Sequence, residues 1–211
     1  AIEGHPGVRA KYPVIAEMVR RVANPQIRNM GTIGGNLCYG DPASDPPACF
    51  LALGGEVKAI RGSQERVIRL DDFFTDYYEN ALAPDEVLTE VRIPPLPKNS
   101  VGFYTRFTTT AAEPRPLVAV GLLLTLDGRE TCREARLALG AVTPFPVRLG
   151  KVEQFLRGKR LSADVLAQAG AVAATEIRPQ SDFRGSAEYR KDVVKVMVRR
   201  TLERALAQAV A

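Results

Sequence analysis

The sequence predicts an α+β fold in which helices cover a small antiparallel sheet. Three segments in the second half of the chain have the β-branched and apolar composition of strands. The three segments after them repeat apolar residues every three or four positions, which is typical of helices. A proline-rich stretch, residues 94–97, separates this part from a mixed region before it. We therefore place a domain boundary there and divide the chain into residues 1–97 and 98–211.

The first region is predicted to begin with a helix over residues 13–22. Its apolar residues recur at helical spacing behind Pro13, which is tolerated in a first turn, and Asn24-Pro25 ends the helix. Residues 27–47 have no regular period and are rich in Gly, Pro, Asn, Asp and Ser, so we expect an extended, structured loop. A short helix near residues 47–53 follows it. Strands are then expected at residues 56–60, 66–70 and 86–93.

The second region is predicted to contain three strands and then three helices. The strands are expected at residues 102–109, 117–126 and 134–141. The turn between the last two strands falls at Asp127-Gly128. The helices are expected at residues 152–156, 162–175 and 187–209. Ser162 is the expected N-cap of the middle helix, because a serine hydroxyl can accept from the free amides of a first turn.

Composition narrows the class of protein. With 211 residues and 45% hydrophobic content, the chain can bury a real core. No run of about 18 apolar residues exists, so we expect no membrane insertion. Residues 1–6 lack the basic-then-apolar plan of a signal peptide, and the expected location is the cytoplasm. Cys38, Cys49 and Cys132 have no metal-binding spacing, so they are expected to be buried, reduced thiols rather than disulfide or cluster ligands.

The charge of +5 and the pI near 9.3 permit an anionic partner. The basic residues are nevertheless scattered among acidic ones, which argues against a nucleic-acid surface. One denser set lies in and beside the last helix, and acidic residues interrupt it. We interpret that set as a solvated or partner-facing flank of the helix. Its members are Arg190, Lys191, Lys195, Arg199, Arg200 and Arg204.

One glycine-rich segment, residues 28–37, has the composition of a ligand-binding loop. Gly34 and Gly35 permit positive φ and let backbone N–H groups approach a ligand closely. Thr32 and Asn36, which flank them, supply a hydroxyl and an amide that can donate to phosphate oxygens or to a sugar. A tight connection with no ligand is the alternative. The glycines also do not follow a strand in the way that the dinucleotide-fold fingerprint requires.

A carboxylate follows this segment at a fixed distance. Asp45 stands nine positions after Asn36, in a turn that Pro42, Pro46 and Pro47 are expected to make rigid. A fixed carboxylate can accept hydrogen bonds from a ring N–H or from a ribityl hydroxyl. The segment therefore has one end suited to a phosphate and one end suited to a ring. A cleft between Gly34 and Asp45 is what this hypothesis requires.

The string from Ile27 to Asn36, IRNMGTIGGN, followed by DPASD from Asp41 to Asp45, closely resembles the second flavin-binding signature of the FAD subunits of molybdenum hydroxylases. This family includes xanthine dehydrogenase and aerobic carbon monoxide dehydrogenase. Other segments resemble the family as well, so that the similarity covers essentially the whole chain. These segments are residues 72–77, 82–88, 91–95 and 182–190.

The resemblance implies both a fold and a function. The fold would be the C-terminal part of a two-subdomain FAD-binding domain of the PCMH type, followed by the family's C-terminal domain. The chain would be an electron-transfer subunit that passes electrons from iron–sulfur clusters through FAD to an acceptor. Its partners would be a large subunit with a molybdenum cofactor and a small subunit with two [2Fe–2S] clusters. No side chain of this chain would act as a catalytic acid, base or nucleophile.

The resemblance also implies site residues. The FAD pyrophosphate and ribityl chain would contact Thr32, Ile33, Gly34, Gly35 and Asn36. Asp45 would hold the polar edge of the isoalloxazine or its ribityl neighbour, and Leu88 would pack on the ring. Arg106 stands where many members have a lysine near the flavin, and Ala23 aligns with a backbone contact. The alternatives are that Leu88 is only a core residue of its strand and that Arg106 is only a surface residue.

Members of the family carry a first flavin-binding signature, which should precede Ala1. We expect the chain alone to bind FAD weakly, with a companion chain supplying that part or the chain being a fragment. A non-enzymatic scaffold for subunit docking is the rival hypothesis. Two other residues, His5 and Cys38, are not assigned to chemistry. The carboxylates of residues 71–79 are interpreted as part of an amphipathic turn that its aromatic side chains pack, and not as a metal site. They are Asp71, Asp72, Asp76 and Glu79, and the aromatic residues are Phe73, Phe74, Tyr77 and Tyr78.

Overall fold

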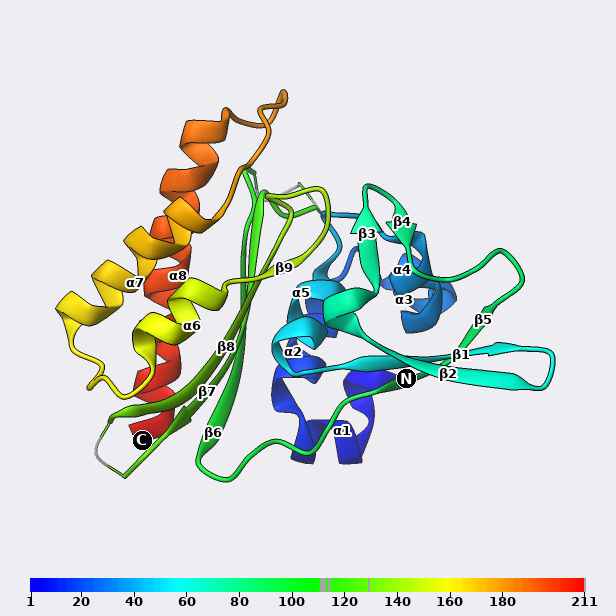
Figure 1. Cartoon of the computed structure of the whole chain (residues 1–211), viewed down its shortest axis with the longest axis horizontal. Coiled ribbons are helices and arrows are strands. Elements are labelled where there is room, and N and C mark those ends of the chain that lie inside the picture. Colours follow the sequence, from blue (N-terminus) through cyan, green and yellow to red (C-terminus); the bar gives the residue numbers. More distant parts are fainter. Residues whose placement is uncertain (111–112, 114, 129, 211) are drawn as a thin grey trace.

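The computed structural model describes residues 1–110, 113, 115–128 and 130–210 (Figure 1). The first half of the chain consists of short helices followed by small sheets. Its helices are η1 (Ile2–Gly4), α1 (Pro6–Lys11), α2 (Pro13–Arg21), α3 (Pro25–Met30), α4 (Ile33–Tyr39), α5 (Asp45–Ala52) and η2 (Leu70–Asp72). Its strands are β1 (Glu56–Arg61), β2 (Gln64–Arg69), β3 (Phe74–Asp76), β4 (Glu79–Asn80) and β5 (Val87–Arg92). The sheets have the orders β2-β1-β5 and β3-β4.

The second half forms an antiparallel sheet with three helices, as the sequence predicted, but the sheet has a fourth, two-residue strand that was not predicted. The strands are β6 (Ser100–Phe107), β7 (Val118–Leu126), β8 (Cys132–Gly140) and β9 (Val147–Arg148), and they lie in this order in the sheet. The helices are α6 (Gly150–Leu156), α7 (Ala163–Glu176) and α8 (Ala187–Val210). The hydroxyl of Ser162 accepts from the Val165 amide at 3.3 Å, so the predicted cap of α7 is confirmed.

Both faces of this sheet are covered, because α6, α7 and α8 lie on one side and α5 and α2 on the other (Figure 1). Alternate residues of each strand point to opposite faces. Leu122 and Leu137 are buried under α6–α8, whereas Leu123 joins the core of the first half. Gly121 lies so close to α5 that a Cβ there would be 2.3 Å from the carbonyl oxygen of Ala48. All nine residues of β7 are therefore buried.

The predicted loop over residues 27–47 is wrong, because this segment contains three helices. The Asn24 side chain accepts from the Ile27 amide and begins α3, and Thr32 begins α4. Helices of six to eight residues are too short to show a clear apolar period, so caps rather than periodicity define them. Gly34 and Gly35 lie inside α4, and neither is among the residues with positive φ. The positive φ that these two glycines permit is therefore not adopted.

The other predicted elements of the first half form close to the expected positions. Residues 93–97 have no regular structure between β5 and β6, as the proline-rich sequence suggested. The core of the first half nevertheless includes Tyr104, Ala119 and Ala138 from the second-half sheet. The two halves thus share buried surface, and the division at residue 97 stays a prediction. In the described part of the chain, no helix is long and apolar enough to cross a membrane.

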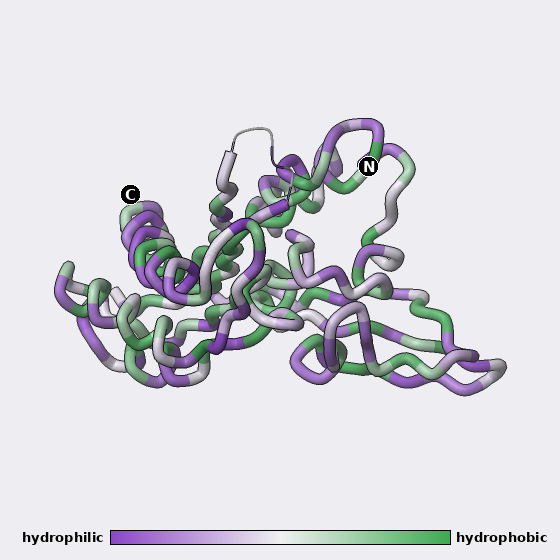
Figure 2. Tube along the Cα trace, turned by 90° about the horizontal axis from the view of Figure 1, so that it is seen from above, coloured by the Kyte–Doolittle hydropathy of each residue, from purple (hydrophilic) through white to green (hydrophobic). Residues whose placement is uncertain are grey.

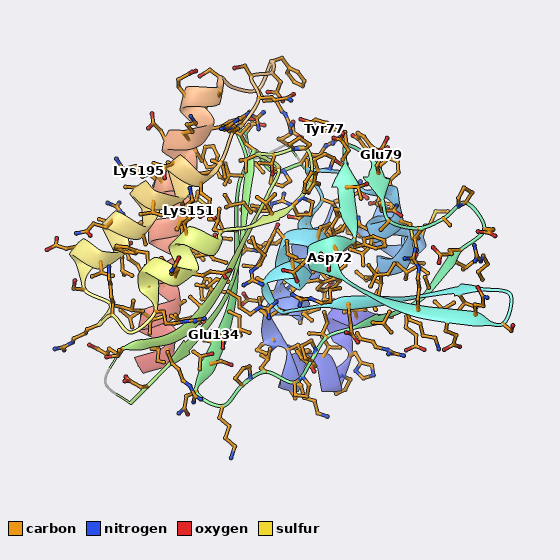
Figure 3. The ribbon with its side chains drawn as sticks, viewed as in Figure 1. Asp72, Tyr77, Glu79, Glu134, Lys151 and Lys195 are labelled. Carbon is orange, nitrogen blue, oxygen red and sulfur yellow. The ribbon has the colours of Figure 1, made fainter. Side chains whose placement is uncertain are left out.

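Helix α8 covers the outer face of the sheet, and hydrophobic and hydrophilic residues alternate along it (Figure 2). Val194 and Leu202 are fully buried, whereas Lys191 and Lys195 are exposed, which agrees with a solvated flank (Figure 3). Arg190 departs from that prediction. It is only 3% exposed, and it forms an ion pair with Asp182 at 2.6 Å.

The segment with interleaved carboxylates and aromatic residues is only partly as predicted. Phe73 and Phe74 are buried and pack edge to face. Tyr77 and Tyr78 are exposed, although we expected them to pack the turn. Figure 3 shows Tyr77 at the tip of the β3–β4 hairpin, and its hydroxyl lies 3.4 Å from the side-chain oxygen of Gln180.

Candidate functional site

The glycine-rich segment forms the first turn of α4. The hydroxyl of Thr32 accepts from the Gly35 amide at 3.0 Å and caps the helix. Because α4 begins at Ile33, the amides of Ile33 and Gly34 have no carbonyl partner within the helix. Thr32 and Gly35 are exposed, and Gly34 is half-buried. Backbone donors of this turn thus remain available to a ligand from outside.

A side chain at either glycine would crowd this turn. A Cβ at Gly35 would lie 2.9 Å from the Thr32 Oγ1, and one at Gly34 would lie 3.4 Å from Leu88 Cδ2. The structure therefore brings Leu88 of β5 against the turn, as the hypothesis of a shared site requires. Leu88 is half-buried and also packs on the core of the first half. It is therefore a core residue of its strand as well as a neighbour of the turn. Ile33 packs on the same core.

Ala23 lies in the connection between α2 and α3, in a left-handed conformation with φ of 42°. This backbone conformation is unusual for a residue with a Cβ. The guanidinium of Arg28 holds it from the side, because Nη1 donates to the carbonyl oxygens of Val22 at 2.8 Å and of Ala23 at 3.3 Å. Ala23 is thus a fixed backbone position, and Arg28 is what fixes it.

Asn36 links α4 to the start of α5. Its side-chain oxygen accepts from the Ser44 hydroxyl at 2.7 Å, and Ser44 is the residue before α5. The amide nitrogen of Asn36 keeps its two donors, because the oxygen is the atom that this contact uses. Asn36 and Asp45 are therefore coupled through Ser44.

Asp45 is the first residue of α5 and not part of a turn, which corrects the prediction. Its side chain is 4% exposed, and it is held by two donors from β6. The Tyr104 hydroxyl donates to Oδ1 at 2.5 Å. Nη1 of Arg106 lies 3.1 Å from Oδ1 and 3.0 Å from Oδ2. The prolines were expected to fix Asp45; in the structure, burial and the donors Tyr104 and Arg106 hold its carboxylate.

Burial raises the pKa of Asp45 from its usual value, because a charged carboxylate loses water there. The hydrogen bond from Tyr104 and the charge of Arg106 oppose this rise. Burial also raises the pKa of Tyr104 well above its usual value, and the nearby Asp45 charge adds to the rise. Tyr104 therefore keeps its proton and acts as a donor, while Asp45 acts as an acceptor.

Arg106 is not a surface residue, since only 15% of its side chain is exposed. Besides Asp45, its Nη1 contacts the carbonyl oxygen of Arg21 at 2.8 Å. This contact ties β6 to the end of α2, two residues before Ala23. The nine predicted residues thus form a connected region through α4, α5, β5, β6 and the end of α2.

The sequence interpretation missed three residues of this region: Arg28, Ser44 and Tyr104. Tyr104 had a usable signal, because it lies two positions before Arg106 in a strand and so shares its face. Arg28 and Ser44 lie within the conspicuous segment, but their contacts depend on helices that were not predicted.

The predicted residues do not line either of two cavities found in the described part of the chain. A cavity of about 190 Å³ is lined instead by Pro42, Tyr78, Arg115, Arg190 and their neighbours. The glycine turn lies open at the surface, while Asp45 is buried below it. His5 is exposed at the edge of the first half. Burial raises the pKa of the half-buried Cys38 thiol, so this residue is a poor nucleophile.

Comparison with known proteins decides the family. Residues 1–96 match the FAD binding domain in molybdopterin dehydrogenase, and residues 110–205 match the CO dehydrogenase flavoprotein C-terminal domain. The carbon monoxide dehydrogenase medium chain of Afipia carboxidovorans is 35% identical over 209 residues, which span 99% of this chain and 72% of that protein. The chain belongs to the FAD-binding medium subunits of the molybdenum hydroxylases.

Other members of the family agree with this assignment. The nicotine 6-hydroxylase medium subunit of Paenarthrobacter nicotinovorans is 37% identical over 203 residues, which span 95% of this chain and 70% of that subunit. A structure of CO dehydrogenase from Oligotropha carboxidovorans superposes with a TM-score of 0.92 at 35% identity, over 98% of this chain and 72% of that one. The chain is therefore an oxidoreductase subunit of a flavoprotein family, and FAD is its cofactor.

Proposed function

We propose that this medium subunit receives electrons from the iron–sulfur clusters of a small subunit and passes them through FAD to an acceptor. The oxidation of substrate would take place in a large subunit that holds the molybdenum cofactor. Bound FAD supplies the redox chemistry, and the protein positions and tunes it. The single observation that carries the proposal is the open first turn of α4, which lies beside Leu88 and is coupled through Asn36 and Ser44 to the buried Asp45.

Each predicted residue has a proposed role in holding FAD. The α4 turn, from Thr32 to Asn36, binds the pyrophosphate and ribityl chain, because its free amides favour negative charge. Leu88 packs against the ring. Asp45 accepts from the polar edge of the flavin, and Arg106 balances the charge of that carboxylate. Ala23 contributes a backbone group that Arg28 fixes.

The site needs further protein around it. We propose that another flavin-binding segment, from a different part of the protein or from a companion chain, completes the hold on the pyrophosphate. The partners are proposed to be the molybdenum-cofactor large subunit and the small subunit with two [2Fe–2S] clusters. The cytoplasmic location rests on sequence alone and stays a prediction.

Gly34→Ala tests the role of the α4 turn. If the glycine is only part of a helix, the variant should keep its FAD affinity; if the glycine lets FAD approach, the affinity should fall. In a helix, Ala is more favourable than Gly by about 0.5–1 kcal/mol, so the variant should be as stable as the wild type or more so. If FAD approaches the turn closely, the added methyl group should weaken FAD binding at least roughly tenfold, about 1.4 kcal/mol. The measurements are FAD content and affinity of the purified native assembly, together with thermal unfolding.

Gly150→Ala is the matched control, because Gly150 is an exposed glycine in the first turn of another seven-residue helix. It should leave FAD affinity unchanged. An assembly without flavin would contradict the proposed function and favour a scaffold. Equal FAD affinity in Gly34→Ala and the wild type would remove the α4 turn from the site.

A further inference from the structure

We propose that Tyr104 is a positioning residue for the flavin, which acts through Asp45. Its hydroxyl holds Oδ1 of that carboxylate and so presents Oδ2 to the polar edge of the cofactor. This inference rests on the proposed function, because it takes Asp45 as a flavin contact. It adds a residue that the family-based assignment of the site does not include.

The count of acceptor positions on Asp45 supports the inference. An ionised carboxylate has two oxygens and about four acceptor positions. Oδ1 accepts from both the Tyr104 hydroxyl at 2.5 Å and Arg106 Nη1 at 3.1 Å. These two donors occupy both acceptor positions of Oδ1. Oδ2 receives only Arg106 Nη1, at 3.0 Å. Oδ2 is therefore the oxygen that can accept from a ligand.

Tyr104 is built into the structure as a fixed donor. It is 3% exposed, it lies on β6 opposite Gly121 of β7, and it belongs to the core that includes Ala48 and Cys49 of α5. The side chain of Arg106 is longer and reaches two acceptors besides Asp45 Oδ1, so it does not set the carboxylate orientation alone. Without the phenol, Arg106 alone would hold the carboxylate of Asp45, and Oδ1 would lose the hydrogen bond that the hydroxyl donates.

A purely structural role is the competing explanation, because a buried hydroxyl that bonds to a carboxylate also stabilises the fold. The neighbouring residue offers a control for that role. Thr105 faces the opposite side of β6, where its hydroxyl bonds to Thr201 Oγ1 at 2.5 Å, and both residues are buried. Thr201 donates to the Met197 carbonyl, so Thr105 is the donor in that pair. Thr105→Val thus removes one buried hydroxyl bond far from the flavin side.

The experiment compares Tyr104→Phe, Thr105→Val and Asp45→Asn in the purified native assembly. It measures FAD affinity, the midpoint potential of bound FAD and the urea midpoint of unfolding. Tyr104→Phe should weaken FAD binding roughly tenfold and should also change the ratio of affinities for oxidised and reduced FAD. A tenfold change in that ratio corresponds to about 30 mV for a two-electron couple. Thr105→Val should lower the urea midpoint to a similar extent and leave both flavin properties unchanged.

The three variants separate the role of Tyr104 from that of Asp45. If Tyr104→Phe lowers only the urea midpoint, as Thr105→Val does, the residue is structural and the inference is overturned. If Asp45→Asn weakens FAD binding while Tyr104→Phe does not, Asp45 remains a flavin contact and only the role of Tyr104 fails. If neither variant affects the flavin, the proposed site itself is wrong at Asp45.

Discussion

The two faces of the β6–β9 sheet differ in what they bury. The face under α6–α8 buries mainly Leu, Val and Ala and a neutral hydroxyl pair, Thr105 with Thr201. Its buried charge is Arg190, near the start of α8, which pairs with Asp182. The face against α5 buries a carboxylate, a phenol and part of a guanidinium in addition to apolar residues. One strand, β6, supplies both faces in alternation.

This difference separates stability from ligand binding. Burying apolar surface stabilises a domain without a desolvation penalty. Burying a charge carries that penalty, which hydrogen bonds and an opposite charge must compensate. The α5 face contains such a buried charge at Asp45, where the proposed function needs a fixed carboxylate. We expect variants of the two faces to affect stability and flavin binding in different proportions.

The largest effect is expected from Leu122→Ala on the α8 face. Leu122 is 1% exposed, and truncating a buried leucine costs about 2–5 kcal/mol of unfolding free energy because it leaves a cavity. Urea unfolding measures the loss. The folded fraction should keep the wild-type flavin absorption spectrum and FAD affinity. A weakened affinity in the folded fraction would break the separation of the faces, and Leu122→Met, which nearly conserves volume, is the control.

A smaller loss of stability, but a change in the flavin, is expected from Gly121→Ala. The added Cβ would lie 2.3 Å from the carbonyl oxygen of Ala48, so α5 must move. Overpacking of this kind costs about 1–3 kcal/mol. Because α5 carries Asp45, FAD affinity should fall as well. Gly128→Ala is the matched control, since its Cβ would meet nothing within 4 Å. Unchanged FAD affinity in Gly121→Ala would argue that the position of α5 does not set the site.

The smallest effect concerns pH and Asp45. Burial raises the pKa of Asp45, so folding favours its protonated form. The resulting stabilisation is complete below the unfolded pKa of about 3.9 and is lost as the pH rises through the higher, folded value. Asp45→Asn removes this contribution. The stability difference, wild type minus variant, should therefore fall with rising pH in that window, by at most about 1.4 kcal/mol per pH unit.

Urea unfolding of both proteins between acidic and neutral pH measures this difference. Leu122→Ala, which carries no charge change, should keep the wild-type pH dependence. A difference that rises with pH would mean that Tyr104 and Arg106 outweigh burial at Asp45.

Long, regular elements were predictable from the sequence. The strands β6–β8 and the helices α7 and α8 are long enough to show their apolar periods in the sequence. The prolines in residues 94–97 interrupt regular structure because proline has no backbone N–H and a fixed φ. The segment from residue 27 to residue 47 was not predictable in this way. Its helices are short, and caps and tertiary contacts stabilise them instead of a continuous apolar stripe.

The sequence by itself determined the family, the α+β class and the residues Thr32 to Asn36, Asp45, Leu88 and Arg106 as candidates, because these lie in strings that resemble a known signature. Only the tertiary structure decided that Gly34 meets Leu88, that Arg106 is half-buried, and that Tyr104 holds Asp45. The physical reason is that these contacts join residues 54–61 positions apart. Such pairs are set by how α4 packs on β5 and how α5 packs on the β6–β9 sheet, which no local pattern encodes.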